Sequence, residues 1–232
     1  MKKIAMVVTG IIVFMSCATT QAGVIVGGTR VVYDGSREES TLTVQNQDKS
    51  PWVIQAWVDG NGPTGTEKEV SKPPFAITPA LSRLTANGLS IIHISRTGGA
   101  LPENKESVYW LNIKSIPEYV QSKENRLTIA VDQRIKLIFR PKGISSPTVL
   151  DYRKVTFKKD GKKLNVMNPT PYWLTFYSLD IGGSNIKTEN VMIPPTGKAT
   201  YSLPENRSAK NINWQLINDY GGHTEVMTSI LE

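Results

Sequence analysis

One segment constrains the fold of this chain more than any other: residues 127–139, Leu-Thr-Ile-Ala-Val-Asp-Gln-Arg-Ile-Lys-Leu-Ile-Phe. Every second position is apolar except Gln133. Alternation with a period of two over this length predicts a single β-strand. At about 3.3 Å per residue, the strand would extend roughly 40 Å, about twice the usual length.

A long apolar strand has two readings. If one edge stays unpaired, its free N–H and C=O groups recruit other chains, and a protein that keeps such an edge uses it to bind a partner by strand addition. The alternative is a central strand of a sandwich, with a neighbour on each side. The pattern alone favours the central strand.

The N-terminus has the layout of a secretory signal. Lys2 and Lys3 precede an apolar run from Ile4 to Met15, and small residues follow up to Ala22. The run is too short for a retained transmembrane helix. We therefore predict a signal peptide over residues 1–22, export to a bacterial periplasm, and no membrane insertion.

Cysteine and charge then exclude several kinds of site. The only cysteine, Cys17, lies in the predicted signal, so the mature chain is expected to have no disulfide and no thiol chemistry. Removal of Lys2 and Lys3 lowers the net charge from +7 to +5. The densest basic group, Lys158–Lys163, flanks Asp160-Gly161 in a predicted hairpin turn. No nucleic-acid partner is predicted.

Strand signals dominate the rest of the chain, and turn-forming dipeptides separate them. After Phe139 the composition changes, because residues 140–147 are rich in Pro, Gly and Ser, as inter-domain linkers are. We predict an all-β fold of two β-sandwich domains, 23–143 and 148–232. The predicted strands are Arg30–Tyr33, Ser40–Gln45, Trp52–Val58, Ser90–Ile94, Val108–Ile113, Leu127–Phe139, Lys154–Phe157, Leu164–Met167, Tyr172–Leu179, Lys198–Leu203 and Ile212–Asn218.

Motifs for catalysis are scarce. Residues 60–65 formally match G-x-G-x-x-G, but no helical period follows, so a hairpin loop is the better interpretation. His93 and His223 lie far apart and have no acidic partner at helical spacing, which makes a weak case for a metal or a catalytic triad. The prediction is a non-enzyme with no catalytic residues, no metal and no cofactor.

Five segments occur in a fixed order across the chain: Thr29–Gly35, Leu101–Asn112, Ile135–Pro141, Asn168–Tyr172 and Ile217–Gly222. Together they resemble the PapD-like periplasmic pilus chaperones of the chaperone–usher family. The resemblance implies two immunoglobulin-like domains in a boomerang arrangement. It also implies an ATP-independent chaperone that binds pilus subunits one to one and delivers them to an outer-membrane usher.

The resemblance assigns roles to the long strand. It implies that Leu127, Ile129 and Val131 are donated to a pilus subunit that lacks its own last strand. It also implies that Arg30 and Lys136 hold the C-terminal carboxylate of the subunit in the cleft between the domains. Without the family, these two cations would be interpreted as surface residues.

A third set is implied between the domains. In relatives, an acid of the first domain, an arginine after the long strand and an acid of the second domain form an ionic network. The matching positions here are Glu106, Arg140 and Asp219. Pro79 and Pro117 resemble family prolines at turns, where the sequence leaves the cis or trans state open.

Two alternatives remain open from the sequence. The chain is also compatible with a secreted two-domain structural or adhesive fibre protein, which would polymerise or be exposed on the cell surface. An open strand edge further leaves room for self-association of the free protein. The sequence does not identify the subunits or the usher.

Overall fold

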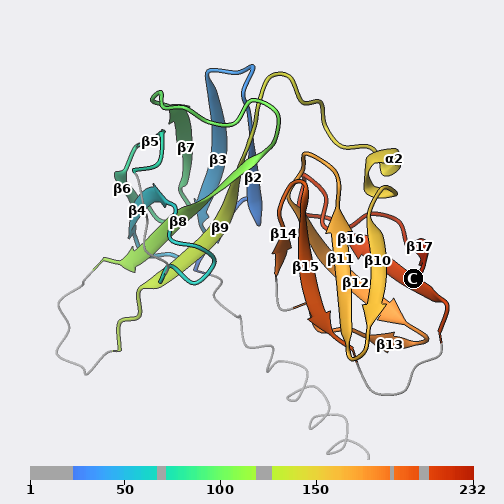
Figure 1. Cartoon of the computed structure of the whole chain (residues 1–232). Helices are drawn as coiled ribbons and strands as arrows, with labels where there is room; N and C mark the ends of the chain where they lie inside the picture. The colour runs from blue at the N-terminus through green and yellow to red at the C-terminus, as the bar shows by residue number, and fades with distance from the viewer. Residues whose placement is uncertain (1–22, 67–71, 119–126, 189–190, 204–208) are drawn as a thin grey trace, which may run out of the picture.

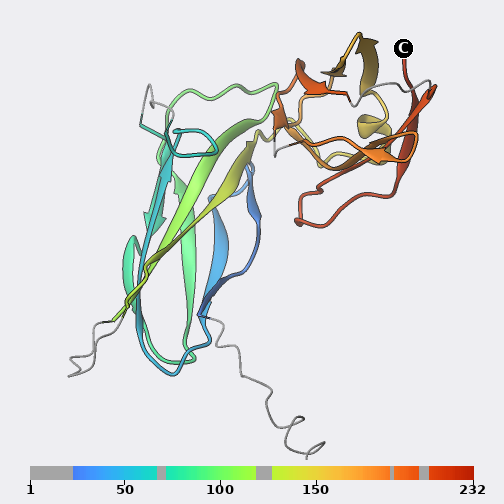
Figure 2. The ribbon, with the colours of Figure 1, turned by 90° about the horizontal axis from the view of Figure 1, so that it is seen from below.

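The computed structural model describes residues 23–66, 72–118, 127–188, 191–203 and 209–232. The predicted signal peptide lies outside these residues. The described chain forms two β-sandwiches that meet at an angle, and a connection around residues 141–148 joins them (Figure 1, Figure 2). The predicted all-β fold with two sandwich domains in a boomerang arrangement is confirmed.

The first sandwich packs a sheet with the order β1-β3-β7-β5 against a sheet with the order β2-β9-β8-β4-β6. Its strands are β1 (Val24–Val26), β2 (Arg30–Asp34), β3 (Glu39–Asn46), β4 (Trp52–Asp59), β5 (Phe75–Thr78), β6 (Leu81–Leu84), β7 (Leu89–Arg96), β8 (Ser107–Pro117) and β9 (Val131–Arg140). The sequence predicted neither β1, β5 nor β6. These strands are short, and short strands carry little alternation.

The chain changes sheets between β1 and β2. β1 pairs antiparallel with β3, whereas β2 pairs in parallel with β9. Gly27 and Gly28 lie between them, and the Gly27 N–H donates to the Thr43 carbonyl at 2.8 Å. A Cβ on Gly27 would lie 3.0 Å from that oxygen, so a larger residue would press against the β3 backbone. This crossing places β2 beside β9.

The long strand begins at Val131, so the prediction of a continuous strand from Leu127 is wrong for its first four residues. β9 pairs with β8 in a register that sets Ser115 opposite Val131, and β8 ends two residues later at Pro117. Proline has no N–H to donate, and no described strand lies beside residues 127–130. An extended ladder cannot form there without a partner.

The second sandwich packs a sheet with the order β10-β11-β15 against a sheet with the order β13-β12-β16-β17, in which β14 also pairs with β12. Its strands are β10 (Thr156–Asp160), β11 (Lys163–Asn168), β12 (Leu174–Ile181), β13 (Ser184–Asn185), β14 (Met192–Ile193), β15 (Gly197–Ser202), β16 (Asn211–Leu216) and β17 (Met227–Ile230). A one-turn helix that the sequence did not predict, α2 (Val149–Tyr152), precedes them. The Asp151 carboxylate accepts hydrogen bonds from both the N–H and the hydroxyl of Thr148, which closes the first turn of this helix.

Each domain has its own core. The first is built around Tyr33, which packs edge-on against Phe75 and donates its hydroxyl to the Glu38 carbonyl at 2.6 Å. The second is built around Trp214, which is fully buried against Phe157 and Phe176. The Thr78–Pro79 peptide bond is cis. Within the described ranges, no helix has the length and apolar character needed to cross a bilayer.

Candidate functional site

Arg30 and Lys136 meet where β2 and β9 pair. They are opposite each other in the parallel register, so their side chains leave the same face of the sheet. The Lys136 Nζ donates to the Thr175 Oγ1 on β12 at 3.2 Å, and the Arg30 Nη1 donates to the Ile217 carbonyl at 3.3 Å. Both cations therefore bridge from the first domain to the second.

These two charges are poorly compensated. Burial, followed by repulsion from Arg30, lowers the pKa of Lys136 from 10.5 to about 8. Burial also lowers the pKa of Arg30, although the nearby Asp219 acts in the opposite direction. Neither cation forms a salt bridge with a described carboxylate, and the buried Nε of Arg30 has no hydrogen-bond partner among the described residues. Two partly buried cations therefore lie side by side with no ion-pair partner among the described carboxylates.

The free part of β9 starts immediately beside this pair. β2 pairs with β9 only from Lys136 to Arg140, whereas β8 pairs with it from Val131 to Phe139. Residues 131–135 therefore have one strand neighbour within the described chain. The apolar side chains that lead away from the cations become steadily more exposed: Val131 47%, Ile129 60% and Leu127 86%. The strand therefore combines the two interpretations given by the sequence. Its C-terminal half has a strand neighbour on each side, and its N-terminal half has one open edge among the described residues.

Glu106, Arg140 and Asp219 come together at the junction of the domains. The Arg140 Nε donates to the Glu106 Oε1 at 2.8 Å, while its Nη1 and Nη2 donate to the two Asp219 carboxylate oxygens at 2.7 and 2.8 Å. Arg140 and Glu106 are only 6% and 3% exposed. The bidentate geometry to Asp219 joins the end of β9 to the second domain.

Backbone groups complete this junction. The Glu106 Oε2 accepts the N–H of Trp173 at 2.7 Å, and the indole N–H of Trp173 donates to the Glu106 carbonyl at 3.2 Å. Burial raises the pKa of Glu106, while Arg140 and the Trp173 N–H oppose that rise. The internal space left around the network is only about 10 Å³.

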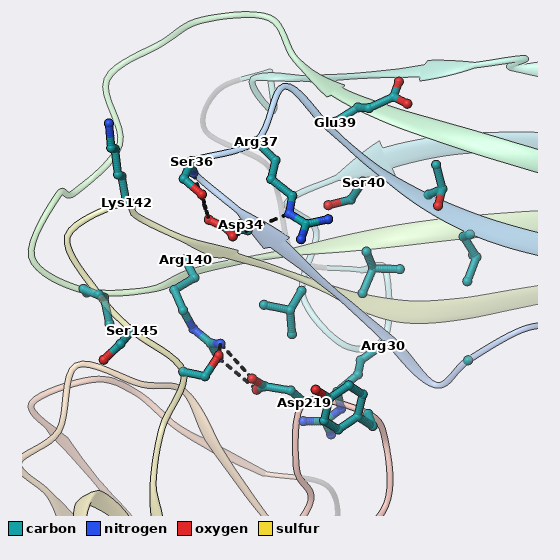
Figure 3. Close-up of a pocket in the computed structure, with 18 of the residues that line it drawn as sticks. Arg30, Asp34, Ser36, Arg37, Glu39, Ser40, Arg140, Lys142, Ser145 and Asp219 are labelled. Atoms are coloured by element: carbon teal, nitrogen blue, oxygen red, sulfur yellow. Dashed lines mark hydrogen bonds and ion pairs between the residues drawn. The ribbon is translucent and has the colours of Figure 1, made fainter.

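A larger cleft of about 850 Å³ opens on the β2 side of the same junction (Figure 3). Figure 3 shows the Arg140–Asp219 pair on one side of it and the exposed Asp34–Arg37 contact further along β2. The Arg140 contacts therefore join the two domains at the edge of this cleft.

Sequence reasoning missed the partners that the second domain supplies. Thr175, Ile217 and Trp173 each contact a predicted site residue. Ile217 acts through its backbone carbonyl, which leaves no residue-type signal, whereas Trp173 contributes both its backbone N–H and its indole N–H. Thr175 is an ordinary strand threonine, 1% exposed, and becomes distinctive only because Lys136 lies opposite it.

The site and the fold define a class before any comparison. A strand edge that is half open and ends beside two uncompensated cations suits an extended polypeptide segment with a terminal carboxylate, held by backbone pairing and charge. Two immunoglobulin-like sandwiches that carry this edge form a protein-binding module of the strand-addition type.

The comparisons with known proteins agree with this class. A family model described as the pili and flagellar-assembly chaperone, PapD N-terminal domain, matches residues 23–145, and that of the pili assembly chaperone PapD, C-terminal domain, matches residues 151–228. The chain belongs to the PapD-like family of pilus-assembly chaperones, as the sequence motifs indicated.

Individual relatives match over nearly their full length. Chaperone protein FocC of Escherichia coli is 34% identical, with 97% of this chain and 98% of FocC covered. Chaperone protein FimC of Escherichia coli K12 is 35% identical over 96% and 92% of the two chains. The solved complex of the Salmonella enterica SafA pilin with the SafB chaperone contains a chain with a TM-score of 0.81 and 32% identity, covering 92% of this chain and 99% of that one.

Proposed function

We propose that this protein is a chaperone that holds one pilus subunit at a time, by lending the open edge of β9 to the subunit and binding its C-terminal carboxylate between Arg30 and Lys136. The observation that carries the proposal is continuity: the unpaired edge at residues 127–135 runs directly into the uncompensated cation pair. From Leu127 to Lys136 this track spans about 30 Å, at 3.3 Å per residue. The SafB chaperone was solved with a pilin, which supports the same partner class here.

The exposed apolar side chains of the track supply the binding free energy. Leu127, Ile129 and Val131 are exposed in the free protein and would fill a groove that the subunit leaves open. Each such burial is worth roughly 1.5–3 kcal/mol before ordering is subtracted. The described chain covers these side chains only in part, so packing within this chain explains little of their apolar character.

The test uses the tagged chain expressed with the pilin-like subunits encoded beside it. The chain recovered from the periplasm should begin at Gly23 and carry subunits one to one. Ile129→Ser should reduce the subunit recovered by about tenfold with little change in the melting temperature, because Ile129 is mostly exposed in the free chain. As a matched control, Leu81→Ser changes an equally exposed apolar residue, 66% against 60%, on the far edge strand β6. Equal recovery with Ile129→Ser and with Leu81→Ser would contradict strand donation.

Binding of a carboxylate should also weaken as the pH rises. Lys136 must be protonated to hold the anion, and its pKa of about 8 in the free protein means that binding takes up a proton above that pH. The affinity for a synthetic extended peptide with a free C-terminal carboxylate should fall between pH 7 and pH 9.5, by at most about tenfold per pH unit. Lys136→Met should flatten this profile, as should amidation of the peptide. A flat profile with the unmodified chain and peptide would count against the role of Lys136.

The finer features of the proposal come from the family and from residues outside the described structure. We place the protein in the bacterial periplasm, exported by the predicted signal at residues 1–22. We also propose delivery of subunits to an outer-membrane usher and no enzymatic activity. Family membership and the open edge favour this function over a structural or adhesive fibre component. The domain limits of 23–143 and 148–232 stay a prediction.

A further inference from the structure

Arg134 makes an unusually large set of contacts for a residue on the open part of β9. Its Nη1 donates to the Asp59 Oδ2 at 2.8 Å, and its Nη2 donates to the other Asp59 carboxylate oxygen. It also donates to the Asn112 Oδ1, and to the Gly62 carbonyl from Nε at 2.9 Å and from Nη2 at 2.6 Å. The guanidinium carbon lies 5.3 Å from the centre of the Trp110 ring.

These contacts are shielded from water. Asp59 is 7% exposed and Asn112 is 2% exposed. Burial acts to raise the pKa of Asp59, but the hydrogen bonds from Arg134 and from the Asn61 N–H outweigh it and keep that pKa below its ordinary value. The Arg134–Asp59 ion pair on the outer face of the sheet is therefore largely desolvated and fixed in one geometry, unlike a solvated surface pair.

The position of Arg134 on the strand gives the contacts their meaning. β2 begins at Arg30, opposite Lys136, so among the described strands only β8 pairs with residues 131–135. Asn112 lies opposite Arg134 on β8, and Asp59 ends β4, the next strand along. The Arg134 side chain thus connects β9 across β8 to β4. It does so in the part of β9 that β2 does not pair with.

The same side chain also holds a loop. Gly62 belongs to the Gly60–Thr66 segment, whose glycines formally match a nucleotide-binding motif in the sequence. In Figure 1 this teal loop after β4 lies across β8 and against β9. The Cβ of a larger residue at Gly65 would lie 3.5 Å from the Arg134 Nη1, so the loop wraps closely around the guanidinium.

We propose that Arg134 is a positioning residue for strand addition: it holds residues 131–135 and the Gly60–Thr66 loop in the extended arrangement with which an incoming subunit pairs. The inference rests on the proposed function, since it concerns the same edge. A strand that is already ordered loses less conformational entropy on binding, which raises affinity without a new contact to the partner.

The first test needs no ligand. Hydrogen–deuterium exchange over residues 131–135 of the full chain should become about tenfold faster or more in Arg134→Met, because one hydrogen bond to a charged group corresponds to roughly a factor of ten. Exchange over residues 137–140 should not change. Arg134→Lys, which keeps the charge but cannot bridge three partners, should give an intermediate rate.

Two further variants separate positioning from general stability. Asp59→Asn with Arg134→Met removes both charges and so avoids leaving Asp59 buried and unpaired. Arg83→Met breaks another arginine–carboxylate pair of the same sheet, a solvent-exposed one with Glu118 at 2.8 Å at the β6 edge. The double variant should speed exchange over 131–135, whereas Arg83→Met should not.

The second test measures binding of a synthetic extended peptide with a free C-terminal carboxylate. Arg134→Met and the double variant should weaken binding about tenfold, with Arg134→Lys between them and the parent chain. Unchanged exchange and unchanged affinity in both the double variant and Arg134→Lys would overturn the positioning role. Failure of the parent chain to bind any such peptide would instead contradict the proposed function, and the exchange rates would still decide whether Arg134 orders the edge.

Discussion

Replacing Arg30 by alanine should weaken the capture of pilus subunits about a hundredfold while both domains stay folded. The loss follows from chemistry, since each hydrogen bond between an ionised donor and a carboxylate is worth about 1.5–3 kcal/mol. The retained fold follows from the structure. Arg30 is partly buried, its Nε has no hydrogen-bond partner among the described residues, and the hydrogen bond from its Nη1 to the Ile217 carbonyl is 3.3 Å long. Its removal relieves desolvation as much as it removes contacts, so the free energy of unfolding should change by less than about 1 kcal/mol.

The same argument applies to Lys136, whose buried charge opposes folding below about pH 8 because its pKa in the folded protein lies below 10.5. Two buried cations that destabilise the free protein, and whose charges a partner's carboxylate would compensate, are the kind of feature that binding sites retain at a cost in stability.

A cycle of variant and ligand gives the sharpest measurement for Arg30. Affinities are compared for a synthetic extended peptide with a free C-terminal carboxylate and for its amidated counterpart, with the parent chain and with Arg30→Ala. The parent chain should distinguish the two peptides by about a hundredfold, and the variant by far less. Arg37→Ala is the matched control, because that arginine follows β2 and has a 76% exposed side chain. If Arg30→Ala still distinguishes the two peptides as strongly as the parent chain, the carboxylate lies elsewhere.

Much of the first domain could be predicted from the sequence because its long strands follow a period of two. The same pattern failed at the start of β9, since alternation records which face a residue occupies and not whether a neighbour is present to pair with it. Leu127 and Ile129 continue the pattern of Val131, yet β8 ends at Pro117. That alternation beyond the ladder fits a strand that finds its neighbour in another chain.

The pairing of β2 with β9 was beyond sequence reasoning for a different reason. Parallel neighbours share no hairpin, so no turn motif records that Arg30 lies opposite Lys136. The family resemblance provided that pairing, and the sheet change at Gly27-Gly28 explains it. Neither a turn motif nor the family resemblance predicted the Arg134 contacts, because Asp59 and Gly62 are residue types that are ordinary in turns.

Removing the Arg140 side chain should cause the largest loss of stability among single substitutions at the domain junction. Arg140→Met leaves the Glu106 carboxylate, on a residue that is 3% exposed, with the Trp173 N–H as its remaining hydrogen-bond donor among the described residues. Breaking a buried ion pair on one side typically costs about 3–5 kcal/mol, a large share of a total stability of roughly 5–15 kcal/mol. Chemical denaturation should show the loss, and Lys142→Met, an exposed cation two residues further on, should not.

The pH dependence of this variant has a definite sign. Burial already raises the pKa of Glu106, and without Arg140 the main opposing influence is gone. An acid whose pKa in the folded state is raised stabilises the fold below its unfolded pKa, and that contribution is lost as the pH rises through the folded pKa. Arg140→Met should therefore lose more stability at pH 8 than at pH 5. Glu106→Gln combined with Arg140→Met should recover part of the loss and remove this pH dependence.

Asp219→Asn distinguishes the effect of this network on the angle between the domains from its effect on the stability of the fold. It leaves the Arg140–Glu106 pair intact and weakens only the bidentate contact to the second domain. The Asp219 side chain is 25% exposed, so the free energy of unfolding should fall by only about 1 kcal/mol. The angle between the domains should vary more widely, which small-angle scattering would record as a larger radius of gyration and a broader distance distribution. A large loss of stability with unchanged scattering would mean that the network holds the fold together and leaves the domain angle to other contacts.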